Sequence, residues 1–218
     1  HELAPVYASA NIACDQNQLM METLKKVALR KDMVCLLHEK PFAWVNGSGK
    51  HNNWSLNLDG NKSLLDQGKT AESNERFLLF LVAVIWAVDE YAGLLRVSVS
   101  GPGNDQRLGG NEAPPAVISV FLGDQLTDVL NELSTGKPSA LRQGGNLQMG
   151  VTTIPDLPKD IADRNRTSPF AFTGKKFEFR MLGSSMSIAD CNIIINTAVA
   201  EIVSRIADRL EKAEDIHA

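Results

Sequence analysis

The chain has 218 residues, of which 44% are hydrophobic and 22% are charged, as in an ordinary globular protein with one sizeable core. Its formal net charge of −4 excludes nucleic-acid binding by bulk phosphate neutralisation, because no basic excess is available. The longest apolar run, Phe77 to Val88, is shorter than the ~20 residues that span a bilayer. We therefore expect neither a nucleic-acid nor a membrane partner.

Three cysteines lie far apart in the chain, without the spacing of a metal site or a CxxC motif: Cys14, Cys35 and Cys191. Such thiols are typical of a reducing, cytoplasmic protein. The chain opens on His1-Glu2 without an initiator methionine or an apolar leader, so no signal peptide is predicted. We interpret the chain as a fragment of a longer polypeptide.

In chain order, apolar residues at helical spacing predict a first helix from Asn17 to Arg30. The apolar run at 33–37 predicts a buried strand. A loop rich in Gly and Asn at 46–49 precedes an alternating strand from His51 to Leu56. The polar residues at 59–69 predict a second loop.

The next elements are a long helix from Ser73 to about Tyr91 and a strand at 94–99. A Gly-rich loop follows at 100–110, then an apolar run at 116–121 and a helix at 124–133. These predictions depend on periodicity and on the positions of turn-forming residues.

Many turn formers at 134–160 predict an irregular excursion. A strictly alternating strand at 175–181 and an amphipathic helix at 193–210 follow. Strands and helices do not alternate regularly, as they do in a parallel sheet. The fold class predicted is therefore α+β, with a largely antiparallel sheet covered by helices.

Each alternating strand has one polar face, because side chains alternate between the two faces of a strand. The polar residues are His51, Asn53 and Ser55 on the first strand, and Lys176, Glu178 and Arg180 on the second. A solvated sheet face with cross-strand ion pairs would have the same composition. Taken together, however, a histidine and a carboxylate form a ligand set for a divalent cation, and carboxylates favour Mg²⁺ or Mn²⁺. Flanking cations beside a metal suit phosphate groups.

The Gly-rich loop at 46–49, just before His51, belongs to the string KPFAWVNGSGKHNNWSL, residues 40–56. It lacks the GxxxxGK[ST] phosphate-binding pattern, and a generic Gly-rich turn explains the loop alone equally well. The whole string resembles the signature of glutamine synthetases, in which KP and a short spacer precede NGSG, a variable residue and a metal-binding His. Three later segments match the family in the same order, namely NDQRLGGNEAP (104–114), RNRT (164–167) and KFEFR (176–180).

The spellings HNNWS, NEAPP and DRNRTSPFAFTG resemble the type III branch in particular. The resemblance implies that residues 1–218 are part of a glutamine synthetase catalytic domain, with 134–160 as an irregular insertion and with the upstream domain and a C-terminal extension absent. It further implies a cytoplasmic, ring-shaped homo-oligomer active in glutamine biosynthesis. ATP is the co-substrate, glutamate and ammonium are the substrates, and Mg²⁺ or Mn²⁺ occupies two or more sites.

The resemblance also implies residue roles. Glu2, His51 and Glu178 would bind metal. The substrate would be bound by Asn46, Gly47, Arg107 and Arg180. The nucleotide would be bound by Asn53, Ser55, Arg166 and Lys176. Catalysis would depend on Arg166 and Arg180, which stabilise the transferring phosphoryl group, and on Glu112 as general base.

Some features depart from the family. The second carboxylate after Glu2 has no clear counterpart, and Asp15 is only a candidate. The flap from Arg107 to Glu112 is one residue shorter than in the commonest branch, and an apolar run at 169–172 replaces a second phosphate-binding Arg. Two alternatives stay open, a glutamate–amine ligase and a non-catalytic structural or regulatory relative. We expect the isolated chain to have little or no activity.

Overall fold

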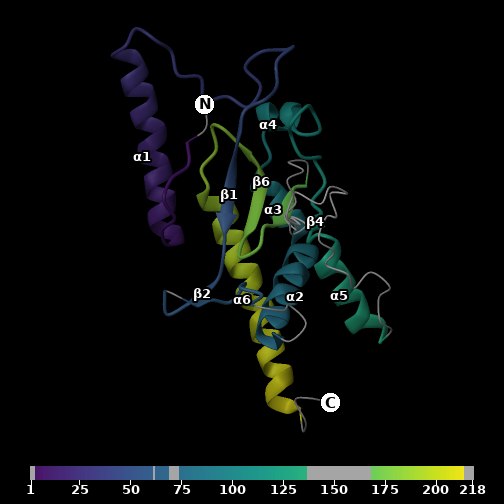
Figure 1. Cartoon of the computed structure of the whole chain (residues 1–218). Helices are drawn as coiled ribbons and strands as arrows, with labels where there is room; N and C mark the ends of the chain where they lie inside the picture. The colour runs from purple at the N-terminus through teal and green to yellow at the C-terminus, as the bar shows by residue number, and fades with distance from the viewer. Residues whose placement is uncertain (1–2, 61, 69–73, 137–167, 214–218) are drawn as a thin grey trace, which may run out of the picture.

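The structure is a computed structural model that describes residues 3–60, 62–68, 74–136 and 168–213. A four-stranded sheet lies at its centre (Figure 1). The strand order is β1-β6-β5-β4, and β2 pairs with β3 in a separate two-stranded sheet. The strands are β1 Gly49–Trp54, β2 Asn57–Leu58, β3 Lys62–Ser63, β4 Val120–Phe121, β5 Phe170–Phe172 and β6 Phe177–Gly183.

Two of the three pairings in the main sheet are antiparallel, β1 with β6 and β5 with β6, whereas β4 and β5 are parallel. The α+β class with a largely antiparallel sheet is therefore confirmed. The helices are α1 Ala10–Leu29, α2 Glu75–Glu90, α3 Ala92–Val97, α4 Pro102–Arg107, α5 Asp124–Thr135 and α6 Ala189–Lys212.

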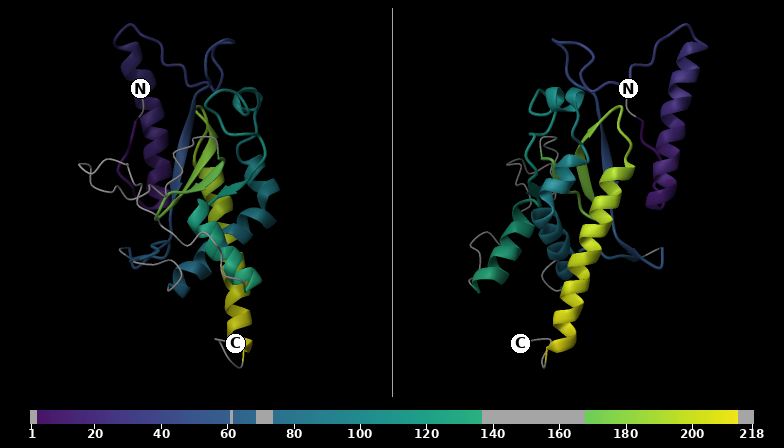
Figure 2. Two further views of the ribbon diagram at one scale, coloured as in Figure 1. Left: turned by 45° about the vertical axis from the view of Figure 1, so that its right-hand side comes forward. Right: turned by 180° about the vertical axis from the view of Figure 1, so that it is seen from behind.

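Helices α2 and α6 pack against each other and cover one face of the sheet (Figure 2). They do so because each has an apolar stripe, from Phe77 to Val88 on α2 and from Cys191 to Ile202 on α6. Helix α1 stands beside the sheet and has no buried residue. No helix in the described part of the chain is long and apolar enough to cross a membrane.

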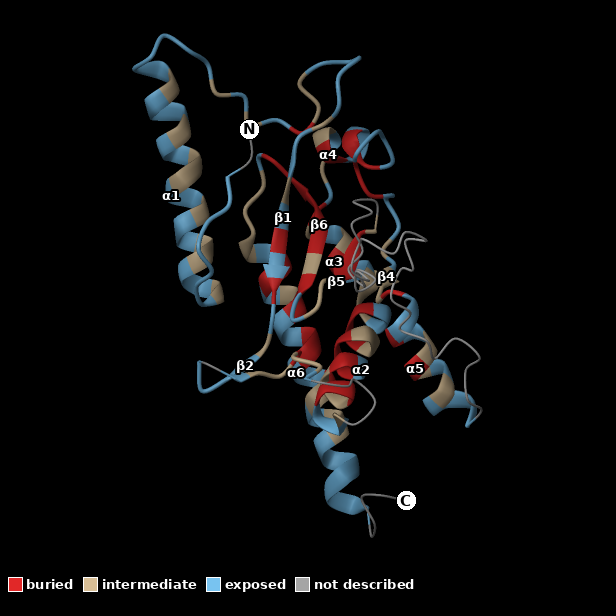
Figure 3. Cartoon of the chain, in the orientation of Figure 1, coloured by how far each residue is buried: buried red, intermediate tan, exposed pale blue. Residues whose placement is uncertain are grey.

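An aromatic cluster joins the sheet to the helices, and buried residues concentrate there (Figure 3). The rings of Phe170 and Phe177 stack with centroids 4.9 Å apart, and Phe172 lies 5.2 Å from Phe177. Phe77 from α2 contacts Phe172 at 5.9 Å. Large buried rings dominate the energetics of such a core, so this cluster fixes β5 and β6 in place.

The structure corrects three of the predicted elements. Residues 33–37 form no strand: Met33 and Val34 are 59% and 83% exposed, and no described strand supplies the partner that their backbone would need. Residues 94–99 were predicted as a strand but lie mostly in helix α3, because a short apolar run does not distinguish the two states. Helix α4 interrupts the predicted loop at 100–110, with Pro102 favouring its first turn.

Other boundaries differ less. Helix α1 begins at Ala10 rather than at Asn17, β3 lies within the predicted loop at 59–69, and β5 was not predicted. Ser73 and residues 137–160 of the predicted irregular excursion lie outside the described residues, whereas residues 134 and 135 continue α5.

Candidate active site

The pairing of β1 with β6 brings His51 and Glu178 together. Asn53 lies directly opposite Glu178, and the register shifts between Lys50 and Asn52, at His51. Such an irregularity changes the direction in which a side chain points, here that of His51. Nδ1 of His51 lies 3.3 Å from Oε1 of Glu178, so the histidine and the carboxylate predicted for one site do meet across the two strands.

Arg180 binds the other oxygen of the same carboxylate. Its Nε donates a 2.6 Å hydrogen bond to Oε2 of Glu178, and its side chain is only 3% exposed. Hydrogen bonds from His51 and then from Arg180 lower the pKa of Glu178 to about 2, although burial acts to raise it. Glu178 is therefore an anion at neutral pH, held between two basic groups.

A second contact joins the loop before β1 to the loop after α4. Nδ2 of Asn46 donates a 3.0 Å hydrogen bond to Oε2 of Glu112. Glu112 has φ of 57°, a left-handed conformation that is uncommon for a residue other than glycine. The base of its loop is closed by a 2.9 Å hydrogen bond from Gly109 N to the Pro114 carbonyl. Strain of this kind persists where the surroundings fix it, and it often marks a functional loop.

Arg107 runs beneath the Asn46–Gly49 loop. Its Nη1 donates to the carbonyls of Met181 and Leu182 at 3.3 and 3.1 Å, and its Nη2 donates to the Arg180 carbonyl at 3.2 Å. The residue is 5% exposed. These carbonyls, together with the side-chain oxygen of Asn104, fix the position of the guanidinium.

Packing against Arg107 explains why the NGSG motif has glycine at positions 47 and 49. A Cβ at Gly47 would lie 2.6 Å from Cγ of Arg107, and a Cβ at Gly49 would overlap its guanidinium. Neither glycine has a positive φ, so what these positions require is close approach to the arginine rather than an unusual backbone conformation.

The remaining predicted residues lie near the same strands or outside the described part. Asn53 and Lys176 are exposed, and Ser55 Oγ donates a 2.8 Å hydrogen bond to the Lys175 carbonyl. Glu2 and Arg166 lie outside the described residues. The structure thus brings His51, Glu178 and Arg180 together, and separately Asn46 with Glu112.

Sequence reasoning missed one charged residue next to the site. Glu39 is 5% exposed, and its carboxylate accepts hydrogen bonds from the backbone and hydroxyl groups of Ser185. Hydropathy gives no signal for it, because a glutamate beside Lys40 is typical of a solvated surface. Only the fold brings Ser185, 146 positions later, against it.

Among the described residues, no group of three or more His, Cys, Asp and Glu side chains converges as a metal site. His51 and Glu178 supply one nitrogen and one oxygen donor for a divalent cation, and the carboxylate favours Mn²⁺ or Mg²⁺. The ionised state of Glu178 also fits a metal ligand. The described residues therefore fit part of a coordination shell.

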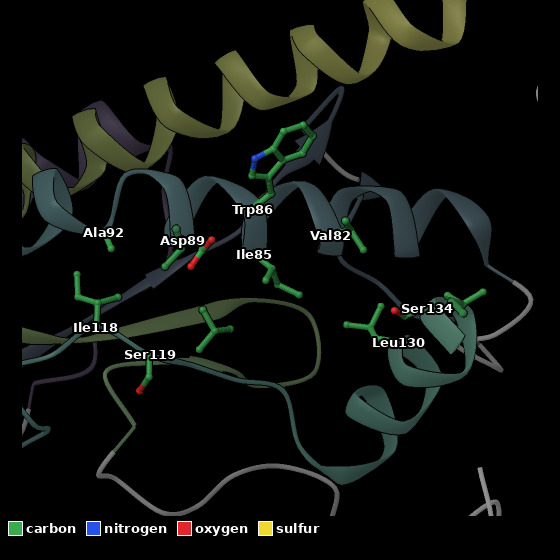
Figure 4. Close-up of a pocket in the computed structure, with 12 residues that line it drawn as sticks. Val82, Ile85, Trp86, Asp89, Ala92, Ile118, Ser119, Leu130 and Ser134 are labelled. Atoms are coloured by element: carbon green, nitrogen blue, oxygen red, sulfur yellow. The ribbon is translucent and has the colours of Figure 1, made fainter. Parts of the chain in front are cut away.

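A separate cavity of about 770 Å³ lies between α2, β4 and α5. Its walls are mainly apolar, with Ile85 and Val82 from α2 facing Leu130 from α5 (Figure 4). Among the described residues that line it, Asp89 is the one charged residue. In the described part of the chain, the cavity shares no residue with the predicted site. Its described lining does not provide the cations and carboxylates that phosphoryl transfer requires.

Comparison with known proteins adds independent information. The profile of a family described as "Glutamine synthetase, catalytic domain" matches residues 1–101. The chain is 52% identical over 210 residues to a type-3 glutamine synthetase of Dictyostelium discoideum, a match that covers 96% of this chain and 29% of that protein. It is 59% identical over 179 residues to a glutamine synthetase of Butyrivibrio fibrisolvens, covering 82% of this chain and 25% of that protein.

A glutamine synthetase of Bacteroides fragilis (strain YCH46) is 45% identical over 214 residues, with 97% of this chain and 29% of that protein covered. The chain therefore spans less than a third of the length of these relatives.

Proposed function

Because the chain belongs to the glutamine synthetase family, we propose that it forms part of a larger enzyme that ligates ammonia to L-glutamate at the expense of ATP. The main support is the group on the outer face of β1 and β6, where an ionised Glu178 lies between His51 and Arg180. A solvated ion pair on a sheet face would not require a histidine at a register shift. It would also not require an arginine whose side chain is only 3% exposed.

The chemistry explains this arrangement. A carboxylate is a poor electrophile, so the γ-carboxylate of glutamate is first phosphorylated by ATP, and the developing negative charge must be stabilised. In the proposed enzyme, His51 and Glu178 hold one divalent metal ion, with Glu2 assigned to another. When bound, Mg²⁺ or Mn²⁺ supplies positive charge to crowded phosphate oxygens.

The chain's own cations complete the charge balance. Arg180 is fixed by Glu178 through its Nε, and its Nη1 donates a 3.4 Å hydrogen bond to the Ser168 carbonyl. Its positive charge, together with that of Arg166, would stabilise the transferring phosphoryl group. Asn53, Ser55 and Lys176 would bind the nucleotide. Asn46, Gly47 and Arg107 would bind glutamate, and Arg180 would contact it at the reacting end.

Glu112 is proposed as the general base for ammonium or the tetrahedral intermediate. It is exposed at the tip of a loop that begins with Gly109 and Gly110, and its hydrogen bond to Asn46 places it above the proposed glutamate loop. A base in this position would supply about 10²–10⁴-fold of the rate. We further propose the cytoplasmic, ring-shaped homo-oligomer that the family implies, which size-exclusion chromatography with light scattering would test.

The test is γ-glutamyl hydroxamate formation by the full-length parent protein with ATP and Mg²⁺ or Mn²⁺. Glu112→Ala and Glu178→Ala should each abolish most of the activity. Glu22→Ala is a matched control, since this exposed carboxylate forms an ion pair with Lys25 on α1, away from the predicted site residues that the structure describes. Equal activity in all four proteins would overturn the site assignment. Product formation with larger amines but not with ammonia would instead favour a glutamate–amine ligase.

A further inference from the structure

A buried carboxylate that the proposed mechanism does not use lies directly behind the NGSG loop. Glu39 precedes the Lys40-Pro41 pair and is 5% exposed. It lies where three segments meet, namely the chain before β1, the turn between β6 and α6, and the first turn of α4. A buried charge is costly unless its surroundings hold it, so its contacts need an explanation.

The hydrogen bonds of Glu39 join two of these segments. Its backbone carbonyl accepts a 2.7 Å hydrogen bond from Ser48 N, within the NGSG loop. Its Oε1 accepts a 3.0 Å hydrogen bond from Ser185 N and another from Ser185 Oγ. Ser184 N in turn donates to the Ser48 carbonyl at 3.2 Å. Glu39 therefore ties the NGSG loop to the turn after β6 through both its backbone and its side chain.

Glycines make the space for this residue. A Cβ at Gly103 would lie 2.8 Å from Oε2 of Glu39, and a Cβ at Gly183 would overlap the glutamate side chain. A Cβ at Gly47 would lie 2.8 Å from the Glu39 carbonyl oxygen. None of the three has a positive φ. Three glycines thus lie close to Glu39, and a side chain at Gly47 or Gly183 would clash with its backbone or its side-chain stem.

The charge of Glu39 acts on two cations, of which Arg107 is buried and Lys50 is half-buried. Burial lowers the pKa of Arg107, and the negative charge of Glu39 opposes that shift. Burial likewise lowers the pKa of Lys50, again against the charge of Glu39. Glu39 forms no direct ion pair with any described residue, so it stabilises both cations through space rather than by contact.

We propose that Glu39 is the positioning residue of the substrate loop, because it fastens Asn46–Gly49 to the turn after β6 and balances the charge of Arg107 beneath that loop. The assignment of a substrate to the loop rests on the proposed function. The positioning itself depends only on the contacts of Glu39. Glu39 touches no predicted metal ligand, general base or phosphate-binding residue in the described contacts, so it acts through Arg107 and the loop.

The experiment compares the full-length parent with its Glu39→Gln variant, which keeps the volume and an oxygen acceptor for Ser185 but removes the charge. We expect the KM for glutamate to rise about tenfold, with the KM for ATP changed by less than about twofold, because the charge supports glutamate binding only. Glu22→Gln is the matched control and should change neither value. Equal increases in both KM values, or no increase in either, would overturn the charge role.

A second measurement does not depend on activity. Hydrogen–deuterium exchange of the peptide covering residues 44–54 should be about tenfold faster in Ser185→Ala and in Glu39→Ala than in the unchanged parent, because the first variant removes a donor to Glu39 and the second removes the acceptor. Unchanged exchange in both variants would overturn the anchoring role. If the unchanged parent makes no hydroxamate but the exchange difference is present, the proposed function fails while the positioning role of Glu39 stands.

Discussion

The two faces of the β1–β6 pair use polar residues in different ways. On the inner face, Nδ2 of Asn52 donates a 3.0 Å hydrogen bond to Asn192, and Nε1 of Trp54 donates a 2.8 Å hydrogen bond to Asn196, both on α6. Each of these groups has a partner on a covering helix. On the outer face, His51 and Glu178 contact each other and stay 33% and 18% exposed on their side chains.

Within this strand pair, the polar groups of the inner face contribute to stability, and we expect those of the outer face to contribute to function. Inner-face polar atoms satisfy hydrogen bonds that burial would otherwise leave unmade. Outer-face polar atoms form a charged group with solvent access, which a ligand can use. Substitution of neighbouring residues on β1 or β6 should therefore affect folding on one face and activity on the other.

The largest effect is expected from Phe179→Ala on the inner face. Phe179 is fully buried and lies 5.9 Å from the ring of Phe170. Its truncation should cost about 3–5 kcal/mol of stability, because the buried ring is lost and the surrounding core fills the resulting cavity only in part. Urea or thermal unfolding of the full-length parent measures the loss. A variant that unfolds at the same point as the unchanged protein would contradict the assignment of this face to the core.

The next largest effect is expected from Glu178→Gln, one residue away on the outer face. We predict a fall of about 100-fold in hydroxamate formation, equivalent to about 2.7 kcal/mol in the barrier, because a neutral amide is a poor metal ligand. The variant should remain folded, as near-ultraviolet circular dichroism would show. Full activity with normal folding would contradict a functional outer face.

These two neighbours also show what the sequence predicts and what it does not. Strict alternation assigned Phe179 to the core and Glu178 to the polar face, because successive side chains of a strand point to opposite faces of the sheet. The register shift at His51 has no signal in the sequence, since it depends on how β1 meets a strand more than 120 positions later, as the His51–Glu178 pair shows.

The wrong predictions have a common physical cause. Residues 33–37 and 94–99 are short apolar runs, and such runs are compatible with a strand, a helix or an exposed segment until their neighbours are known. The burial of Glu39 likewise depends on Ser185 and on Gly183 at the end of β6. The family motif located the site residues by resemblance, but contacts between distant segments required the fold.

A smaller effect is expected at the polar contact on the inner face. Asn52→Ala should cost about 1–3 kcal/mol, because the side-chain oxygen of buried Asn192 loses the hydrogen bond that Asn52 donates. The double variant with Asn192→Ala should cost less than the sum of the single variants, because they share one interaction. Strict additivity in thermal unfolding would show that the two amides are not coupled.

The smallest effect concerns a thiol on the covering helix. Cys191 is fully buried, and burial raises its pKa to about 12, so the thiolate that reacts with alkylating reagents is absent near pH 8. We expect iodoacetamide to modify Cys191 at pH 8 only after unfolding, while Cys14 and Cys35, which are half-buried, react first. Mass spectrometry of peptides from native and urea-treated protein measures this difference. Rapid native labelling of Cys191 would contradict a closed inner face.

The most direct test of the central claim is a Mn²⁺ titration of the full-length parent, followed by electron paramagnetic resonance. We predict that His51→Ala and Glu178→Gln each weaken Mn²⁺ binding by about 10- to 100-fold. Asn52→Ala, next to His51 on the opposite face of β1, should leave the Mn²⁺ affinity unchanged. Equal affinity in all four proteins would contradict a metal site on the outer face of β1 and β6.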